Sequence, residues 1–240
     1  TVVAAGGDGT LFEVVNGLMD RPAAQRESLG LLPMGTGNAF ARDLGLAPGD
    51  IERAIELVSR GSVRPVDVAQ VRTPTEQFHF INILGLGLVT EAARTAERFK
   101  RLGRGAYTLG ALSAVIRLPI SRLALEIDGE PLPVREATFV QVANSRYTGT
   151  SFMMAPQAKQ DDGLLDIVVV DRLTRRRALR LFPTIYEGRH IEAPEVTVHR
   201  ASSVSISEPI GVGCNVDGEF RGRTPLSIRC IPGALSLFGP

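Results

Sequence analysis

The sequence predicts an α/β fold followed by an all-β fold, and three observations support this division. Up to about Val63, short apolar segments alternate with amphipathic helical patterns. Two glycine-rich strings in this part, GGDGT and PMGTGN, each follow an apolar segment. From about Arg64, most of the chain consists of short strand-like segments joined by Asp-Gly, Asn and Pro turns. We therefore expect an N-terminal α/β domain and a second, mainly antiparallel β domain.

The first part is predicted element by element from its apolar spacing. The expected elements are a strand at Val2–Ala5, a helix with Leu11, Val14, Val15, Leu18 and Met19 on one face, a strand at Leu29–Leu32, a helix from Ala39, and a helix around Ile51–Val58 that ends at Gly61. Strand, loop and helix in this order predict parallel strands. The first domain is therefore assigned to residues 1–63.

The second part, residues 64–225, is expected to be rich in strands. Two helical stretches are predicted near Val89–Leu102 and Ala106–Leu118, and strands at Leu123–Ile127, Thr138–Val142, Leu165–Val170, Glu195–His199, Val204–Ser207 and Val212–Val216. Asp-Gly, Asn and Pro between these runs are typical of turns that join antiparallel neighbours.

Composition excludes several classes of protein. The 240 residues carry 27 Lys+Arg against 26 Asp+Glu, so no basic surface for nucleic acid is expected. Two cysteines cannot form a disulfide framework, which favours a reducing, cytoplasmic setting. No apolar run reaches the ~20 residues of a spanning helix. Only five residues precede the first glycine loop, so we expect that the sequence is truncated at its N-terminus.

The first loop, GGDGT, lies between a predicted strand and a predicted helix. The amides of Gly7, Gly9 and Thr10 can therefore face an anion at the positive end of the helix. Asp8 would repel a phosphate at about 4 Å by roughly 4 kcal/mol per charge pair, so a cation such as Mg²⁺ is expected between them. An Asp-Gly turn that caps the helix is the simpler alternative, and the loop alone does not decide between the two.

The second loop, PMGTGN, also lies between a strand and a helix. Glycine loops at two strand ends can face one phosphate chain at the same edge of a sheet. Thr36 offers a hydroxyl group and Asn38 an amide, although Asn38 could instead be a simple helix cap. The loop is not a Walker motif, because no Gly-Lys-Ser/Thr follows, and GxGxxG is not completed.

Acidic motifs mark the second part. Taken alone, DDGLLD is a turn that leads into the strand at Leu165. Asp-Gly-Glu occurs twice, at Asp128–Glu130 and Asp217–Glu219, so the tripeptide alone cannot identify a catalytic base. Glu130 is assigned to a solvated turn.

The ordered set of these strings resembles the diacylglycerol kinase catalytic-domain family, which includes bacterial diacylglycerol kinases and the sphingosine and ceramide kinases. The segments that carry the resemblance are AAGGDGTLFEVVNGL, LLPMGTGNAFARDLGL, GLGLVTEAA, APQAKQDDGLLDIVVV, EGRHIEAPEV and CNVDGEFRG, and they span nearly the whole chain. The resemblance implies a nucleotide-binding first domain that residues 226–240 complete, a β-sandwich second domain, and an active site in the cleft between them.

The resemblance also implies roles for single residues. ATP is expected at Gly6, Gly7, Asp8, Gly9, Thr10, Thr36 and Asn38, and Mg²⁺ at Asp162 with the carbonyl oxygens of Lys159 and Leu164. Glu219 would accept the proton of a lipid hydroxyl as it attacks the γ-phosphate, and Asp217 would support the Mg²⁺ and its waters. Asp8, Asp162 and Glu219 would then converge on one triphosphate.

The lipid remains open at this stage. Ala39 replaces the Asp common in diacylglycerol-type members, Thr90-Glu91 replaces Asp-Ala, and the upstream Asn-Pro-x-x-Gly string is absent. Diacylglycerol is the expected substrate; the alternatives are a sphingoid base or ceramide, then NAD as in NAD kinases, then a lipid-binding module without activity.

Partners are expected from the same resemblance. They are a membrane lipid, the inner membrane surface and a second copy of the chain, and no nucleic acid. Two basic clusters, Arg98–Arg104 and Arg172–Arg180, could hold the protein on an anionic surface, although such runs are more often solvated helix faces.

Overall fold

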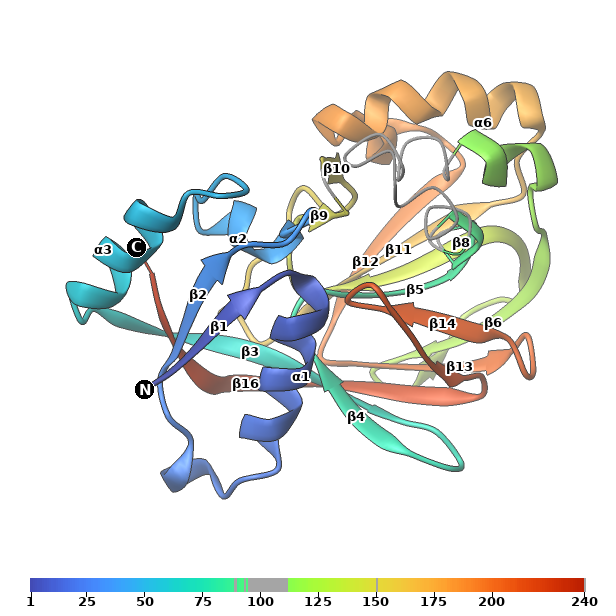
Figure 1. The fold of residues 1–240 in the computed structure, drawn as a ribbon. Helices are drawn as coiled ribbons and strands as arrows, with labels where there is room; N and C mark the ends of the chain where they lie inside the picture. Colours follow the sequence, from blue (N-terminus) through green and yellow to red (C-terminus); the bar gives the residue numbers. More distant parts are fainter. Residues whose placement is uncertain (89, 93, 95–111, 150, 240) are drawn as a thin grey trace.

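The computed structural model describes residues 1–240 except 89, 93, 95–111, 150 and 240. An α/β part lies at one end of the molecule and a larger β-rich part at the other, and both chain termini lie in the α/β part (Figure 1). The N-terminal part contains β1 (Val2–Gly6), α1 (Asp8–Met19), a 3-10 helix (Ala23–Gln25), β2 (Leu29–Pro33), α2 (Ala39–Asp43) and α3 (Ile51–Ser59).

The rest of the described chain is rich in strands, as the turn pattern predicts. It contains β3 (Val63–Arg72), β4 (Gln77–Phe80), β5 (Ile83–Gly87), β6 (Ser121–Ile127), β7 (Glu130–Pro131), β8 (Arg135–Ala143), β9 (Tyr147–Thr148), β10 (Phe152–Met153), β11 (Leu165–Asp171), α6 (Arg175–Leu181), two 3-10 helices (Phe182–Glu187 and Arg189–Glu192), β12 (Val196–Ala201), β13 (Ser203–Glu208), β14 (Gly213–Val216), β15 (Glu219–Arg223) and β16 (Leu226–Phe238).

Strand pairing confirms the predicted fold class. β1 and β2 are parallel, whereas the pairs within the β-rich part are antiparallel. β6 pairs with β13 in one layer and with β8 in the other, so the two layers of the sandwich are joined through one strand. Apolar side chains from both layers, such as Phe80 and Ile206 on one side and Leu84 and Ile167 on the other, form a shared core.

The strands β3 and β16 run through both parts of the molecule. Val66 and Val68 of β3 pack in the α/β core, while Ala69 and Val71 of the same strand pack in the sandwich core. β16 divides in the same way, and its pairing with β3 shifts register between Ile231 and Leu235. Near its end β16 lies beside β2 in parallel orientation. The two parts are therefore built on one continuous pair of strands.

The predicted elements of the first part are confirmed, and so are the six predicted strands of the second part. The strands β3, β4, β5 and β15 and the helix α6 were not predicted individually. Most of the two helical stretches predicted at Val89–Leu102 and Ala106–Leu118 lies outside the described residues, although residues 112–117 are helical. The basic cluster Arg98–Arg104 also lies outside them.

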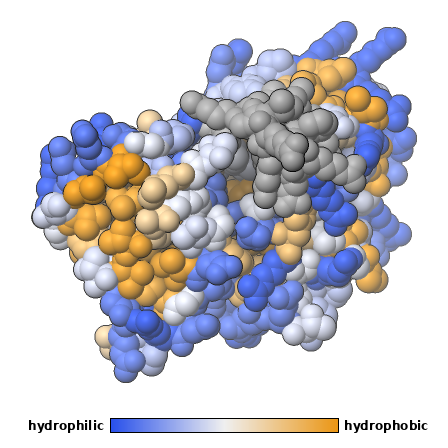
Figure 2. Space-filling model, in the orientation of Figure 1, coloured by the Kyte–Doolittle hydropathy of each residue, from blue (hydrophilic) through white to orange (hydrophobic). Residues whose placement is uncertain are grey.

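The apolar character of the described helices and of the surface bears on membrane contact. None of the helices that the structure describes combines the length and the apolar character needed to cross a bilayer. Apolar surface gathers over the α/β end of the molecule (Figure 2), where Val3 and Ile55 are exposed.

Candidate active site

Two glycine loops meet at the carboxyl ends of β1 and β2. Gly6 of β1 pairs with Pro33 of β2, so both loops leave the sheet at the same edge. The carbonyl oxygen of Gly6 accepts hydrogen bonds from the amides of Met34 (3.0 Å) and Gly35 (3.2 Å). A Cβ atom on Gly35 would lie 2.3 Å from the Cα of Gly7, so the two backbones touch where no side chain fits. The first amides of an α-helix lack carbonyl partners within the helix, and those of α1 follow directly on this loop.

Asp8 begins α1, and its carboxylate reaches across to the second loop. A Cβ atom on Gly37 would lie 2.7 Å from Asp8 Oδ2. Burial raises the pKa of the Asp8 carboxyl to about 6, and hydrogen bonds from the amides of Phe40, Ala39 and Asn38 oppose this rise. Asp8 therefore holds the start of α2 against the first loop.

Glu219 comes to the same loop from the other part of the chain. It is the first residue of β15, directly after the two-residue turn that connects β14 to β15, and it is exposed. A Cβ atom on Gly9 would lie 2.6 Å from Glu219 Oε1. The structure thus brings Glu219 to the residue next to Asp8, as the predicted cleft requires.

Asp217 lies two residues before Glu219 and is buried. Its Oδ2 accepts a hydrogen bond from the amide of Ile81 (3.0 Å), and its Oδ1 accepts from those of Asn82 (3.2 Å) and Ile83 (2.7 Å). Burial raises the pKa of the Asp217 carboxyl to about 7, with a smaller contribution from the charge of Asp8. Asp217 therefore ties the hairpin of Glu219 to the link between β4 and β5. That Asp217 also supports Mg²⁺ and its waters stays a prediction.

The polar side chains of the two loops differ in their freedom to bind a ligand. Asn38 is only 3% exposed, and its side chain bonds to its own loop, at the amide of Gly35 and the carbonyl oxygens of Gly35 and Pro33. Asn38 therefore shapes the loop, and its predicted contact with the nucleotide stays a prediction; it occupies the cap position of α2 without a capping side-chain bond. Thr10 and Thr36 are exposed residues of the two loops, and their predicted contact with ATP stays a prediction.

The predicted metal loop contains a second, buried carboxylate. Asp162 forms an ion pair with Arg200, and its Oδ1 accepts a hydrogen bond from the amide of Leu164 (3.1 Å). Asp166 is 1% exposed, and neither of its oxygens has a hydrogen-bond partner within the described residues. Burial raises the pKa of Asp166 to about 6, against the nearby charge of Arg200.

Arg200 contacts both carboxylates: it forms the ion pair with Asp162, and its Nε lies 3.8 Å from Asp166 Oδ2. Among the described residues, no group of three or more acidic, histidine or cysteine side chains is arranged to hold a metal ion. The predicted Mg²⁺ site therefore stays a prediction. Lys159 and Leu164 lie in the same loop and would contribute only backbone oxygen. The described contacts of Asp162 are with Arg200 and Leu164. Its predicted convergence with Asp8 on one triphosphate therefore stays a prediction.

Asp67 was not singled out from the sequence. It is buried in β3, and its carboxylate accepts hydrogen bonds from the amides of Gly163 (2.7 Å) and Gly233 (2.8 Å). Its own amide donates to the carbonyl oxygen of Gln160 (2.6 Å). Asp67 thereby fastens the metal loop to the two strands shared by both parts. The available signal was a single acid between the apolar residues Val66 and Val68.

A second missed contact crosses from α2 to the β-rich part. Asp43 Oδ1 lies 2.6 Å from Arg146 Nε, and Asp43 Oδ2 accepts from the amide of Arg146 (2.8 Å). The ring of Tyr147 lies 5.4 Å from the guanidinium of Arg146 and 5.5 Å from that of Arg42. No local pattern predicts this contact, because Asp43 and Arg146 are 103 residues apart.

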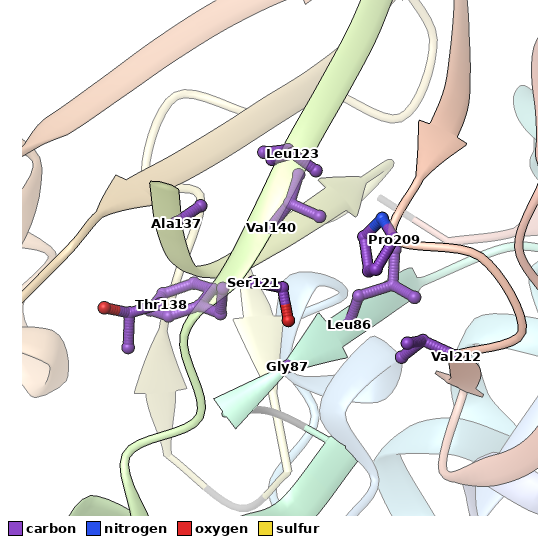
Figure 3. Close-up of a pocket in the computed structure, with 10 residues that line it drawn as sticks. Leu86, Gly87, Ser121, Leu123, Ala137, Thr138, Val140, Pro209 and Val212 are labelled. Carbon is purple, nitrogen blue, oxygen red and sulfur yellow. The ribbon is translucent and has the colours of Figure 1, made fainter. Parts of the chain in front are cut away.

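A small apolar pocket lies in the sandwich between β5, β6 and β8. Leu86, Leu123, Val140 and Val212 are among the side chains that line it, as Figure 3 shows. Its volume of about 20 Å³ admits little more than a water molecule. The pocket in this form does not hold an acyl chain.

Comparison with known proteins agrees with this architecture. The family model of the diacylglycerol kinase catalytic domain matches residues 1–71, and that of the YegS C-terminal NAD kinase beta sandwich-like domain matches residues 82–239. A diacylglycerol kinase of Mycobacterium tuberculosis is 31% identical over 242 residues, which cover 100% of this chain and 76% of that protein. A diacylglycerol kinase of Bacillus subtilis is 33% identical over 226 residues, 93% of this chain and 72% of that protein.

A solved structure agrees as well. It comes from Bacillus anthracis and is described as a provisional diacylglycerol kinase. It superposes with a TM-score of 0.81 at 31% identity, and the match covers 99% of this chain and 77% of that chain.

Proposed function

Because the chain belongs to the diacylglycerol kinase family, we propose that it transfers the γ-phosphate of ATP to a lipid hydroxyl, with diacylglycerol as acceptor and phosphatidic acid as product. The observation that carries the proposal is the meeting of Glu219 with the first glycine loop, next to Asp8. An exposed carboxylate beside a glycine loop at the start of a helix can accept the proton of an incoming hydroxyl group.

In the proposed reaction, Glu219 accepts the proton of the lipid hydroxyl while the hydroxyl oxygen forms a bond to the γ-phosphorus. The bond from that phosphorus to the β,γ-bridging oxygen breaks, and ADP leaves with the electron pair. Glu219 must face the acceptor for this step, and the hydrogen bonds of Asp217 to the link between β4 and β5 fix the hairpin that presents it.

The glycine loops would hold the ATP phosphates through backbone amides, and the hydroxyl groups of Thr10 and Thr36 are exposed beside them. Asp162 and Asp166, with loop carbonyl groups such as those of Lys159 and Leu164, would hold Mg²⁺. A bound Mg²⁺ neutralises phosphate charge during transfer. Asp8, which holds the start of α2, keeps the two loops together so that their amides address one phosphate chain.

The lipid acceptor also implies a place of action. We place the protein in the cytoplasm, at the inner membrane surface where its substrate lies. The cluster Arg172–Arg180 gives this part little support: Arg172 pairs with Glu136, Arg177 pairs with Glu195, and Arg175 donates to the carbonyl oxygen of Ile116. A second copy of the chain stays a further proposed partner.

The identity of the acceptor decides between the proposed function and its alternatives. The protein is incubated with ATP labelled at the γ-phosphate, Mg²⁺ and, in separate reactions, micelles of diacylglycerol, ceramide or sphingosine, or NAD in solution. Label in phosphatidic acid is the expected result. Label in ceramide or sphingosine would reassign the lipid, label in NADP without lipid product would replace the proposal by an NAD kinase, and no label in any acceptor would favour a binding module.

A further inference from the structure

A polar pocket of about 280 Å³ lies beside the hairpin that carries Glu219. The β14–β15 hairpin contributes Gly213, Phe220 and Arg223 to its lining, and the turn between β3 and β4 contributes Glu76. Arg94 also lines the pocket. Successive residues of a strand point to opposite faces. Phe220 therefore faces this pocket, while Glu219 faces the first glycine loop.

One glycine of the lining leaves room beside Arg94. A Cβ atom on Gly213 would lie 3.6 Å from Arg94 Nη2. No side chain extends from Gly213 into the space beside Arg94, and an ordinary residue could stand at Gly213 without backbone strain.

The described lining of the pocket includes two arginines, Arg94 and Arg223, and one acid, Glu76. The guanidinium of Arg94 lies 5.4 Å from the ring centre of Phe220, which holds it in place through a cation–π contact. Arg223 uses one N–H to donate to the carbonyl oxygen of Gly211 (2.9 Å). Neither arginine forms an ion pair within the described part of the chain. Glu76, the acid in the wall, is already paired with Arg221 (3.1 Å).

We propose that this pocket binds a phosphate mono- or diester through Arg94 and Arg223. Guanidinium groups present planar pairs of N–H donors that match phosphate oxygens, and two of them around one hollow favour a group that carries charge and several acceptors. The phosphate could belong to an anionic lipid headgroup or to a free phosphate ester. A phosphate bound here would also contact the hairpin that carries Glu219 and restrict its movement. The relevance of that restriction to catalysis rests on the proposed function, whereas phosphate binding itself does not.

The test measures binding without ATP or turnover. Wild-type protein, Arg94→Gln and Arg223→Gln are sedimented with phosphatidylcholine vesicles that contain or lack one third phosphatidylglycerol, and are titrated separately with glycerol 3-phosphate. Arg60→Gln is the matched control, since Arg60 is an exposed arginine of the same charge in another part of the molecule. We expect Arg94→Gln and Arg223→Gln each to weaken binding to the anionic vesicles or to glycerol 3-phosphate by at least about fivefold. Arg60→Gln should change the same binding constant by less than about twofold.

A further variant separates the pocket from general surface charge. Gly213→Val fills the hollow and keeps both arginines, and it is expected to weaken binding as much as the arginine variants. Loss of vesicle binding alone identifies the lipid headgroup as the source, and loss of glycerol 3-phosphate binding alone identifies a free ester. Equal loss in Arg60→Gln, or no loss in variants whose thermal unfolding is unchanged, overturns the proposal.

Discussion

The two Asp-Gly-Glu hairpins of this chain share a sequence and a backbone but differ in everything that surrounds them. Ile127 pairs with Glu130 across one turn, and Val216 pairs with Glu219 across the other, so both turns have two residues. Both aspartates have positive φ, +47° at Asp128 and +49° at Asp217, and both following glycines do as well. This is the backbone of a hairpin turn that Asp-Gly favours.

The environments of the two turns are opposite. Asp128 lies at the surface, where the hydroxyl and amide groups of Ser202 and Ser203 donate to it and lower its pKa. Asp217 is buried against the link between β4 and β5, and burial raises its pKa to about 7. Glu130 is exposed on a short edge pair, whereas Glu219 meets the first glycine loop. The local sequence thus specifies the turn, and only the tertiary fold distinguishes a catalytic candidate from a surface loop.

The largest expected difference concerns turnover. Glu219→Gln keeps the size of the side chain but removes its capacity to accept a proton, so the rate of lipid phosphorylation should fall about 10²- to 10⁴-fold. Glu130→Gln, the same substitution in the other hairpin, should change the rate less than about twofold. Initial rates at saturating ATP and lipid give both values. Equal rates for the two variants would remove Glu219 from the reaction and favour a binding module.

The second difference concerns stability. Asp217→Asn places an NH₂ group against one of the amides that Asp217 now accepts from, and a buried amide left without an acceptor costs about 1–3 kcal/mol. Asp128→Asn keeps an acceptor for Ser202 and Ser203 at the surface and should change the free energy of unfolding by less than about 0.5 kcal/mol. Urea unfolding followed by circular dichroism measures both. If the two variants lose the same stability, the contacts of Asp217 do not support the hairpin.

Local sequence patterns predicted the elements of the fold but not all of the contacts at the site. The apolar spacing of Leu11, Val15 and Leu18 predicted α1, because a helix buries one face, and the strings GGDGT and PMGTGN predicted loops at strand ends. The role of Asn38 could not be predicted, because its amide bonds only within a loop whose shape is set by Gly7 and Gly35.

Contacts between distant segments were beyond the sequence for a related reason. Asp43 meets Arg146, and Asp67 meets Gly163 and Gly233, only once β3 and β16 have joined the two parts. The contact of Glu219 with the loop of Asp8 became an expectation only through the family resemblance.

The third difference is the sign of the pH dependence of stability. Since the pKa of Asp217 is about 7 in the folded protein and near 4 when unfolded, the folded state binds the extra proton, and stability should fall as pH rises from about 4 to about 7. For Asp128 the lowered pKa has the opposite effect, so its contribution is present above the unfolded pKa and lost in acid.

Single substitutions isolate each contribution. Between pH 5 and pH 7 the free energy of unfolding of the wild type should fall by about 1–2 kcal/mol relative to Asp217→Asn, because only the wild type must give up that proton. The free energy of unfolding of the wild type should not fall relative to that of Asp128→Asn between pH 5 and pH 7. Urea midpoints at half-unit pH steps measure both comparisons. Parallel curves for the wild type and Asp217→Asn would show that Asp217 is ionised in the fold well below pH 5.

The smallest expected difference lies in the turns themselves. Gly129 has φ +86° and Gly218 has φ +95°, and no atom lies within 4 Å of a Cβ built on either. Alanine at each position should therefore cost only the backbone strain of positive φ, roughly 1 kcal/mol, and the same amount in both hairpins. Thermal and urea unfolding of Gly129→Ala and Gly218→Ala test this equality. A clearly greater loss at Gly218 would mean that the β14–β15 hairpin cannot relax as the other one does, because the buried Asp217 holds it.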